Sequence, residues 1–146
     1  MPQIATRHRS ADAAVGYAAD RSGHGVAYVS LATGSGRTVV KVPFSAAPVP
    51  ALGGREFGYA AVGAVAAHLR GRGFTRVRLR LPDQHVVDEL GGRTLVPPPL
   101  AMAYVKTRCA LHGFAVARVE RGEPIETRDL EARAHADVAL RTPAAA

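Results

Sequence analysis

The stretch "FTRVRLRLPDQHVVDEL", Phe74 to Leu90, changes its pattern halfway along. In its first half the apolar side chains of Val77, Leu79 and Leu81 point one way and the intervening arginines the other, which is typical of a strand with one buried face. Its second half predicts a short helix, with Asp83 at the N-cap or in the first turn. A strand that leads directly into a helix indicates an α/β protein.

Toward the N-terminus, three short segments are rich in β-forming residues: "AVGYAA" at 14–19, "GVAYVSLAT" at 25–33 and "TVVKVPF" at 38–44. The connecting sequences "DRSGHG" and "GSGR" contain glycine and have the composition of tight turns. Three consecutive strands joined by short turns predict an antiparallel meander.

The remaining segments alternate helices and strands. The Ala-rich segment 55–71 predicts a helix, segments 100–113 and 127–139 predict two more, and segment 114–120 predicts a fifth strand. The predicted order is therefore β-β-β-α-β-α-α-β-α. This order predicts an α/β fold: a five-stranded mixed sheet in which an antiparallel three-strand meander is followed by α/β alternation, with helices on both faces and right-handed crossovers.

The length of 146 residues predicts one domain with a sizeable core. We expect residues 14–140 to form it, with flexible segments at 1–13 and 141–146. No apolar run is long enough for a membrane span, and the start "MPQIATRHRS" lacks the apolar stretch of a secretory signal, so a cytoplasmic location without membrane contact is expected. The single cysteine, Cys109, excludes an internal disulfide, and its apolar helical surroundings predict a buried thiol.

Basic residues outnumber acidic ones, and the formal net charge is +7. Their distribution is uneven, since no acid occurs from Phe57 through Pro82. The same window contains a group of closely spaced arginines: Arg70, Arg72, Arg76, Arg78 and Arg80. Such a block favours a polyanionic partner, bound through phosphate contacts and counterion release. A solvated basic face without a partner explains the block equally well.

Three acidic residues fall at the ends of predicted elements. Asp20 ends the first strand, Glu56 begins the first helix, and Asp83 ends the fourth strand. Since the first and fourth strands of such a sheet are usually neighbours, these carboxylates are expected to converge. Converging carboxylates repel one another unless cations lie between them, and hard oxygen ligands suit Mg²⁺ or Mn²⁺. Each acid also has a structural explanation, as a turn residue, a favourable charge at a helix N-terminus and an N-cap, respectively.

The order of elements and the positions of these acids resemble the ribonuclease H-like family, in particular its type 1 branch, over about residues 15–139. "YAADRS" resembles the family's "YTDGS" pattern on the first strand, with Asp20 as its acid. "REFGYAAVGAVAAHL" offers Glu56 for the glutamate of the first helix. "VRLRLPDQHVVDEL" resembles the segment in which an aspartate ends the fourth strand.

The match is shifted by one residue at two positions. In the fourth-strand segment the family's aspartate falls on Pro82, and Asp83 comes one residue later. In the last helix it falls near Arg128, beside Asp129, while "HADVAL" offers Asp137 as an alternative. We take Asp129 as the fourth acid, because the first turn of this helix should lie near the sheet edge where the other acids gather.

The resemblance implies hydrolysis of RNA phosphodiesters in an RNA–DNA hybrid or a structured duplex, with one or two Mg²⁺ or Mn²⁺ ions. The implied catalytic and metal-ligating residues are Asp20, Glu56, Asp83 and Asp129. The implied contacts to the nucleic acid come from arginines: Arg21, Arg76, Arg78, Arg80, Arg121 and Arg128. Two alternatives remain open. The domain binds nucleic acid without cleaving it, or it is a scaffold or dimerisation domain without a nucleic-acid partner.

Overall fold

The computed structural model describes residues 9–141. Within them the elements follow the order that the sequence predicts, with one short 3₁₀ helix added before α3. They are β1 (Ser10–Ala19), β2 (His24–Thr33), β3 (Gly36–Ser45), α1 (Arg55–Gly71), β4 (Arg76–Leu81), α2 (Gln84–Leu90), η1 (Pro98–Leu100), α3 (Ala101–His112), β5 (Val116–Arg121) and α4 (Pro124–Arg141).

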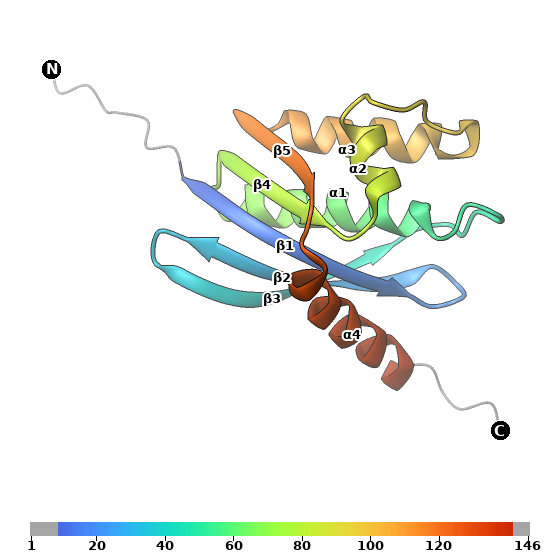
Figure 1. Cartoon of the computed structure of the whole chain (residues 1–146), viewed down its shortest axis with the longest axis horizontal. Helices are drawn as coiled ribbons and strands as arrows, with labels where there is room; N and C mark the ends of the chain where they lie inside the picture. Colours follow the sequence, from blue (N-terminus) through green and yellow to red (C-terminus); the bar gives the residue numbers. More distant parts are fainter. Residues whose placement is uncertain (1–8, 142–146) are drawn as a thin grey trace, which may run out of the picture.

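The strands form one sheet in the order β3-β2-β1-β4-β5 (Figure 1). β1, β2 and β3 pair antiparallel, whereas β4 pairs parallel with both β1 and β5. The predicted mixed sheet with an antiparallel meander is therefore confirmed. Because β1 and β4 are parallel neighbours, their C-terminal ends lie at the same edge of the sheet.

Helices cover both faces of this sheet (Figure 1), as the sequence predicts. α1, α2 and α3 lie on one face, and α4 packs against β1 and β2 on the other. The alternation of side chains along the strands fills both layers. Val15 and Leu79 are fully buried in the larger core with α1, while Ala18 and Val26 pack with Ala134 of α4.

Two boundaries differ from the sequence pattern. β1 begins at Ser10 rather than near residue 14, because its first residues pair with β4, from Ser10 opposite Arg76 onward. A partner so distant in the sequence leaves no local signal. α4 begins at Pro124 rather than at Thr127, since a proline at the first helical position leaves no backbone N–H unsatisfied. The rest of the predicted flexible ends, residues 1–8 and 142–146, lies outside the described residues.

The apolar content of the helices does not always correspond to burial. Cys109 on α3 is exposed, and the prediction of a buried thiol is wrong. α3 buries only Thr107 and Leu111, so one narrow stripe of this helix faces the core and Cys109 lies outside it. No helix within residues 9–141 is long and apolar enough to cross a membrane.

Candidate functional site

The candidate site lies where the C-terminal ends of β1 and β4 meet. The parallel pairing of the two strands runs as far as Ala14 opposite Arg80. Tyr17 and Asp83 each follow three residues later, so the continued register brings this tyrosine close to the aspartate that follows β4. The Oδ1 atom of Asp83 accepts a hydrogen bond from the N–H of His85 at 2.9 Å and caps α2, as the sequence indicates.

Tyr17 fills the space between β1 and α1. Its ring meets that of Phe44 edge-on, with 6.4 Å between the ring centroids. Its hydroxyl oxygen lies against α1, where a Cβ built on Gly58 would be only 2.7 Å away. Glycine in a helix interior is less favourable than alanine by about 1 kcal/mol, and the close approach of Tyr17 explains why a glycine stands here.

Three carboxylates act on the Tyr17 hydroxyl. Burial raises the pKa of Tyr17 well above its usual value, and the negative charges of Asp83, Glu131 and Glu56 raise it further. Asp83 precedes α2, Glu56 stands in the first turn of α1, and Glu131 belongs to α4. The phenol therefore stays neutral in an acidic environment.

Asp20 lies beyond the end of β1, in the turn to β2. Its Oδ1 atom accepts hydrogen bonds from the backbone N–H groups of Ser22 at 2.9 Å and His24 at 3.1 Å, and from the Ser22 hydroxyl at 2.6 Å. The hydrogen bond from the Ser22 hydroxyl is the main cause that lowers the pKa of Asp20. Gly23, with φ at 92°, completes the turn. In the structure Asp20 is thus a turn residue with one carboxylate oxygen occupied, and its role as a metal ligand stays a prediction.

The Ser22 hydroxyl in this turn also contacts Nδ1 of His24 at 2.8 Å. The serine therefore lies between the carboxylate of Asp20 and the imidazole. In a catalytic triad the carboxylate instead orients the imidazole, so these three neighbours do not form one.

Asp129, the predicted fourth acid, stands on the outer side of α4. Its side chain is 67% exposed and pairs with Nε of Arg133 at 3.2 Å, one helical turn further on. The acid of α4 that acts on Tyr17 is Glu131, which the sequence pattern does not single out.

Asp137, the alternative fourth acid, connects α4 to the meander. It accepts a hydrogen bond from the Tyr28 hydroxyl at 2.8 Å and pairs with Nζ of Lys41 and Nε of Arg141, both at 2.7 Å. The hydrogen bond from Lys41 is the main cause that lowers the pKa of Asp137. With three partners on its two oxygens, Asp137 has a structural role.

Glu56 is buried, with 5% of its surface exposed, and its Oε2 atom has no hydrogen-bond partner within residues 9–141. The preceding residue, Arg55, is occupied by another buried acid. Its Nη1 atom binds Oε2 of Glu89 at 2.9 Å, and the Tyr59 hydroxyl donates to Oε1 of Glu89 at 2.7 Å. α1 is thus linked to α2 through a fully paired carboxylate, while Glu56 is left without a cation.

These placements do not form the four-carboxylate centre that the family resemblance implies. Within residues 9–141, no three His, Cys, Asp or Glu side chains are close enough together to hold a metal ion. Asp20 is bound in a turn, Asp129 is exposed on α4, and a neutral tyrosine, Tyr17, lies beside the other acids. Because Mg²⁺ and Mn²⁺ sites depend on carboxylate oxygens, the residues present do not fit this metal centre.

The sequence pattern does not identify Tyr17 and Glu131 as residues of the candidate site, and the reasons are physical. Tyr17 belongs to an alternating strand pattern, and nothing local distinguishes it from a core residue. Glu131 lies near Tyr17 only because α4 packs closely over β1. A Cβ built on Gly16 of β1 would be 2.6 Å from the Cβ of Leu130 on α4. A glycine within a strand is the available signal, since it marks the close approach of another element.

The predicted arginines come from the β1–β2 turn, the sheet and α4. Two of them are held by acids: Arg78 pairs with Glu120 at 2.6 Å, and Arg80 pairs with Asp12 at 2.9 Å and with Glu126 at 2.8 Å. The other four are exposed and form no ion pair within the part of the chain that the structure describes: Arg21, Arg76, Arg121 and Arg128.

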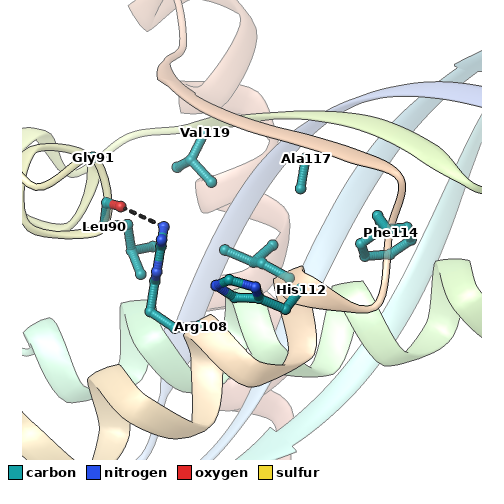
Figure 2. A pocket seen from close by; sticks show the side chains of 8 residues that line it. Leu90, Gly91, Arg108, His112, Phe114, Ala117 and Val119 are labelled. Carbon is teal, nitrogen blue, oxygen red and sulfur yellow. Dashed lines mark hydrogen bonds between the residues drawn. The ribbon is translucent and has the colours of Figure 1, made fainter.

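A cavity of about 340 Å³ lies elsewhere, between α3, the end of α2 and β5 (Figure 2). Arg108 and His112 project beside it from α3, and its floor is apolar, with Leu111, Phe114 and Val119. Nη1 of Arg108 donates to the carbonyl oxygen of Leu90 at 3.0 Å, so this arginine serves to hold α3 to α2.

No protein-family model matches the chain, and no curated protein matches it in sequence. Solved structures match nearly all of it. RNase H1 from the halophilic archaeon Halobacterium salinarum NRC-1 superposes with a TM-score of 0.74 at 19% identity, covering 91% of this chain and 99% of that one. The N-terminal RNase H domain of a Mycobacterium tuberculosis protein gives 0.65 at 15% identity, covering 90% and 95%. LC11-RNase H1 in complex with an RNA/DNA hybrid gives 0.64 at 12% identity, covering 89% and 99%.

The chain therefore has the ribonuclease H-like fold, in the form seen in RNase H1 structures, as its sequence pattern predicts. At these identities the similarity establishes the architecture. The activity of such a fold is set by the residues of its site.

Proposed function

We propose that this chain is a nucleic-acid-binding domain with the ribonuclease H-like fold, and that it binds an RNA-containing duplex without a four-carboxylate metal centre. One observation carries the proposal. Tyr17 stands near Asp83 toward the end of β1, and within residues 9–141 no three His, Cys, Asp or Glu side chains lie close enough together to hold a metal ion. The nucleic-acid partner is supported by a solved structure of this fold that contains an RNA/DNA hybrid.

The proposed contact surface is the part of the sheet face beside α4, on β4 and β5. α4 packs against β1 and β2, and the outward side chains of Arg76, Arg78 and Arg118 on β4 and β5 are exposed. Arg76 and Arg118, which are both exposed, line a shallow hollow of about 390 Å³ there. Neither forms an ion pair within residues 9–141. Guanidinium groups without a carboxylate partner are suited to phosphate oxygens.

The binding proposal is tested by fluorescence anisotropy with labelled RNA–DNA hybrid, RNA duplex and DNA duplex, in EDTA and at increasing salt. We expect the two RNA-containing duplexes to bind more tightly than DNA, because a protein reads such duplexes through their shape and 2′-hydroxyls. The affinity should fall steeply between about 50 and 200 mM salt. Absence of binding to every duplex at the lowest salt would contradict the proposal.

A second candidate is metal-dependent hydrolysis of the RNA strand, favoured by the three acids that act on Tyr17. Labelled hybrid is incubated with the protein and Mg²⁺ or Mn²⁺, alongside the Asp83→Asn and Asp20→Asn variants. We expect the hybrid to stay intact under conditions in which it is bound. Fragments that disappear with Asp83→Asn but persist with Asp20→Asn would instead establish a nuclease, with its site at the end of β4 rather than in the turn.

A further inference from the structure

A second cavity, of about 500 Å³, lies between α1, α3 and the chain that follows β3. Most of its wall is apolar and is formed by residues such as Phe44, Tyr59, Ala60, Leu100 and Ala103. Two side chains with a formal charge line it, those of Glu56 and Lys106. A largely apolar pocket with few polar groups is the usual form of a small-molecule site.

Glu56 gives this cavity a chemical preference. The residue is only 5% exposed, and its Oε2 atom is buried without a hydrogen-bond partner. A buried carboxylate is costly unless a cation or hydrogen-bond donors satisfy it. The nearest cation in the sequence, Arg55, is committed to Glu89. Glu56 lines the cavity, so a ligand bound there lies beside this carboxylate group.

Two other polar groups of the wall, the hydroxyls of Thr107 and Tyr59, already have hydrogen-bond partners. The Thr107 hydroxyl donates to the carbonyl oxygen of Tyr59 at 3.1 Å, and the Tyr59 hydroxyl donates to Glu89. Lys106 is exposed, so its ammonium is hydrated and its charge is screened at the rim. Among these groups, Glu56 is therefore the one that lacks a hydrogen-bond partner within the described residues.

Gly63 keeps the cavity open. It lies in the interior of α1 and lines the cavity, and a Cβ built on it would meet only Oγ1 of Thr107, at 4.0 Å. Alanine would fit here and would favour the helix, so packing within the described residues does not explain the glycine. Its missing side chain adds to the volume beside Glu56.

We propose that this cavity binds a small organic cation, a primary amine on an apolar body. The ammonium donates charge-assisted hydrogen bonds to Glu56, and the apolar body occupies the space between α1 and α3. This binding is independent of the nucleic-acid function proposed above, and it is measured without nucleic acid.

The test compares three probes of similar shape by isothermal titration calorimetry or NMR titration: 2-phenylethylamine, 2-phenylethanol and phenylacetate. We expect the amine to bind at least about tenfold more tightly than the alcohol, the factor that a hydrogen bond to a charged group supplies, and the carboxylate to bind most weakly. Equal affinities for amine and alcohol, or no saturable binding of the amine, would overturn the proposal.

Three variants locate the site. Glu56→Gln should remove the preference for the amine and keep the alcohol bound. Gly63→Leu should fill the cavity and abolish binding of both. The matched control is Gly71→Leu on the same helix, where an added Cβ meets nothing within 4 Å, and it should bind like the unaltered protein. Amine binding that survives both Glu56→Gln and Gly63→Leu, in variants with native circular dichroism, would contradict the assignment. The probe series on the unaltered protein decides the question if a variant does not fold.

Discussion

At Tyr17 one aromatic ring lies among three acids near the C-terminal ends of β1 and β4. The ring packs edge-on against Phe44, and its hydroxyl lies against Gly58 of α1. A carboxylate here would add a fourth negative charge to those of Asp83, Glu131 and Glu56, and it would need a cation to offset the repulsion. The neutral phenol of Tyr17 occupies this position without needing a cation.

Replacing Tyr17 with aspartate tests this reasoning. We expect Tyr17→Asp to lower the free energy of unfolding by roughly 2–4 kcal/mol, because aromatic packing is lost and a charge is added among like charges. Millimolar Mn²⁺ should restore part of this loss, since the added carboxylate supplies the missing ligand. Urea unfolding with and without Mn²⁺ measures both effects.

The matched control is Tyr17→Asn, which loses the same packing but adds no charge. Its stability should not respond to Mn²⁺. An equal response of the two variants would mean that the carboxylates at the ends of β1 and β4 do not share one site.

Local sequence rules correctly predict where two of these acids lie relative to the helices, but they do not predict where β1 ends relative to Asp20. Capping chemistry correctly places Asp83 before α2 and Glu56 in the first turn of α1. Asp20 follows a strand in the sequence, but β1 ends one residue earlier, and "DRSG" binds the carboxylate through its own N–H and hydroxyl groups. The hydrogen bonds that make this segment a good turn occupy one of the two carboxylate oxygens of Asp20. That Tyr17 faces the acids follows from tertiary packing, which no local pattern reveals.

At the level of elements, α4 is attached to the meander by a polar cluster around Asp137. Hydrogen bonding by Lys41 holds the pKa of Asp137 below its usual range, so the ionised carboxylate favours the folded state. This stabilisation is complete above the unfolded pKa of about 3.9 and is lost as the pH falls through the lower folded pKa.

Asp137→Asn should therefore reduce stability at pH 7, by on the order of 1–2 kcal/mol, and reduce it less at about pH 3. Urea midpoints measured from pH 7 to pH 3 test this expectation. If the variant and the unaltered protein lose the same stability over that range, Asp137 does not contribute to the acid sensitivity of the fold.

The contact between α4 and β1 depends on the absence of a side chain at Gly16. A Cβ there would meet the backbone nitrogen of Glu131 and approach the Cβ of Leu130 to 2.6 Å. Gly16→Ala should destabilise the protein by about 1–3 kcal/mol and should speed hydrogen exchange in α4, because the helix has to move away from the sheet.

The control for this prediction is Gly34→Ala in the β2–β3 turn, where an added Cβ meets nothing within 4 Å. Its stability should stay within about 0.5 kcal/mol of the unaltered protein. If Gly16→Ala behaves like Gly34→Ala, α4 does not depend on close packing at this point.

The order of the elements follows from the sequence because each element has its own period. The alternation in β4 and the Ala-rich pattern of α1 are local properties. The start of β1 is not, because Ser10 enters the sheet by pairing with Arg76. The exposure of Cys109 is likewise set by how α3 lies on the core. The sequence therefore predicts the kind and order of the elements. It does not predict element boundaries or side-chain exposure where these depend on contacts with distant parts of the chain.

For the whole molecule, a net charge of +7 overstates the positive charge that is free to meet a partner. Arg78 and Arg80, which look most accessible in the alternating strand, are occupied by Asp12, Glu120 and Glu126. Sequence alone cannot reveal this pairing, because the acids come from β1, β5 and α4. The arginines that remain available are defined by the fold.

The unpaired arginines of the open sheet face yield the last prediction. Arg76 and Arg118 line one hollow on β4 and β5, and neither has a carboxylate partner within the described residues. If each contacts one phosphate, the double variant Arg76→Ala/Arg118→Ala should lower the slope of log affinity against log salt by about 2, since each contact contributes about 0.9. Arg93→Ala/Arg133→Ala removes the same formal charge from arginines that are paired with Asp88 and Asp129. Anisotropy titrations of the RNA–DNA hybrid should show the smaller slope only for the first pair. A similar change in both would assign binding to overall charge and leave the sheet face without a specific role.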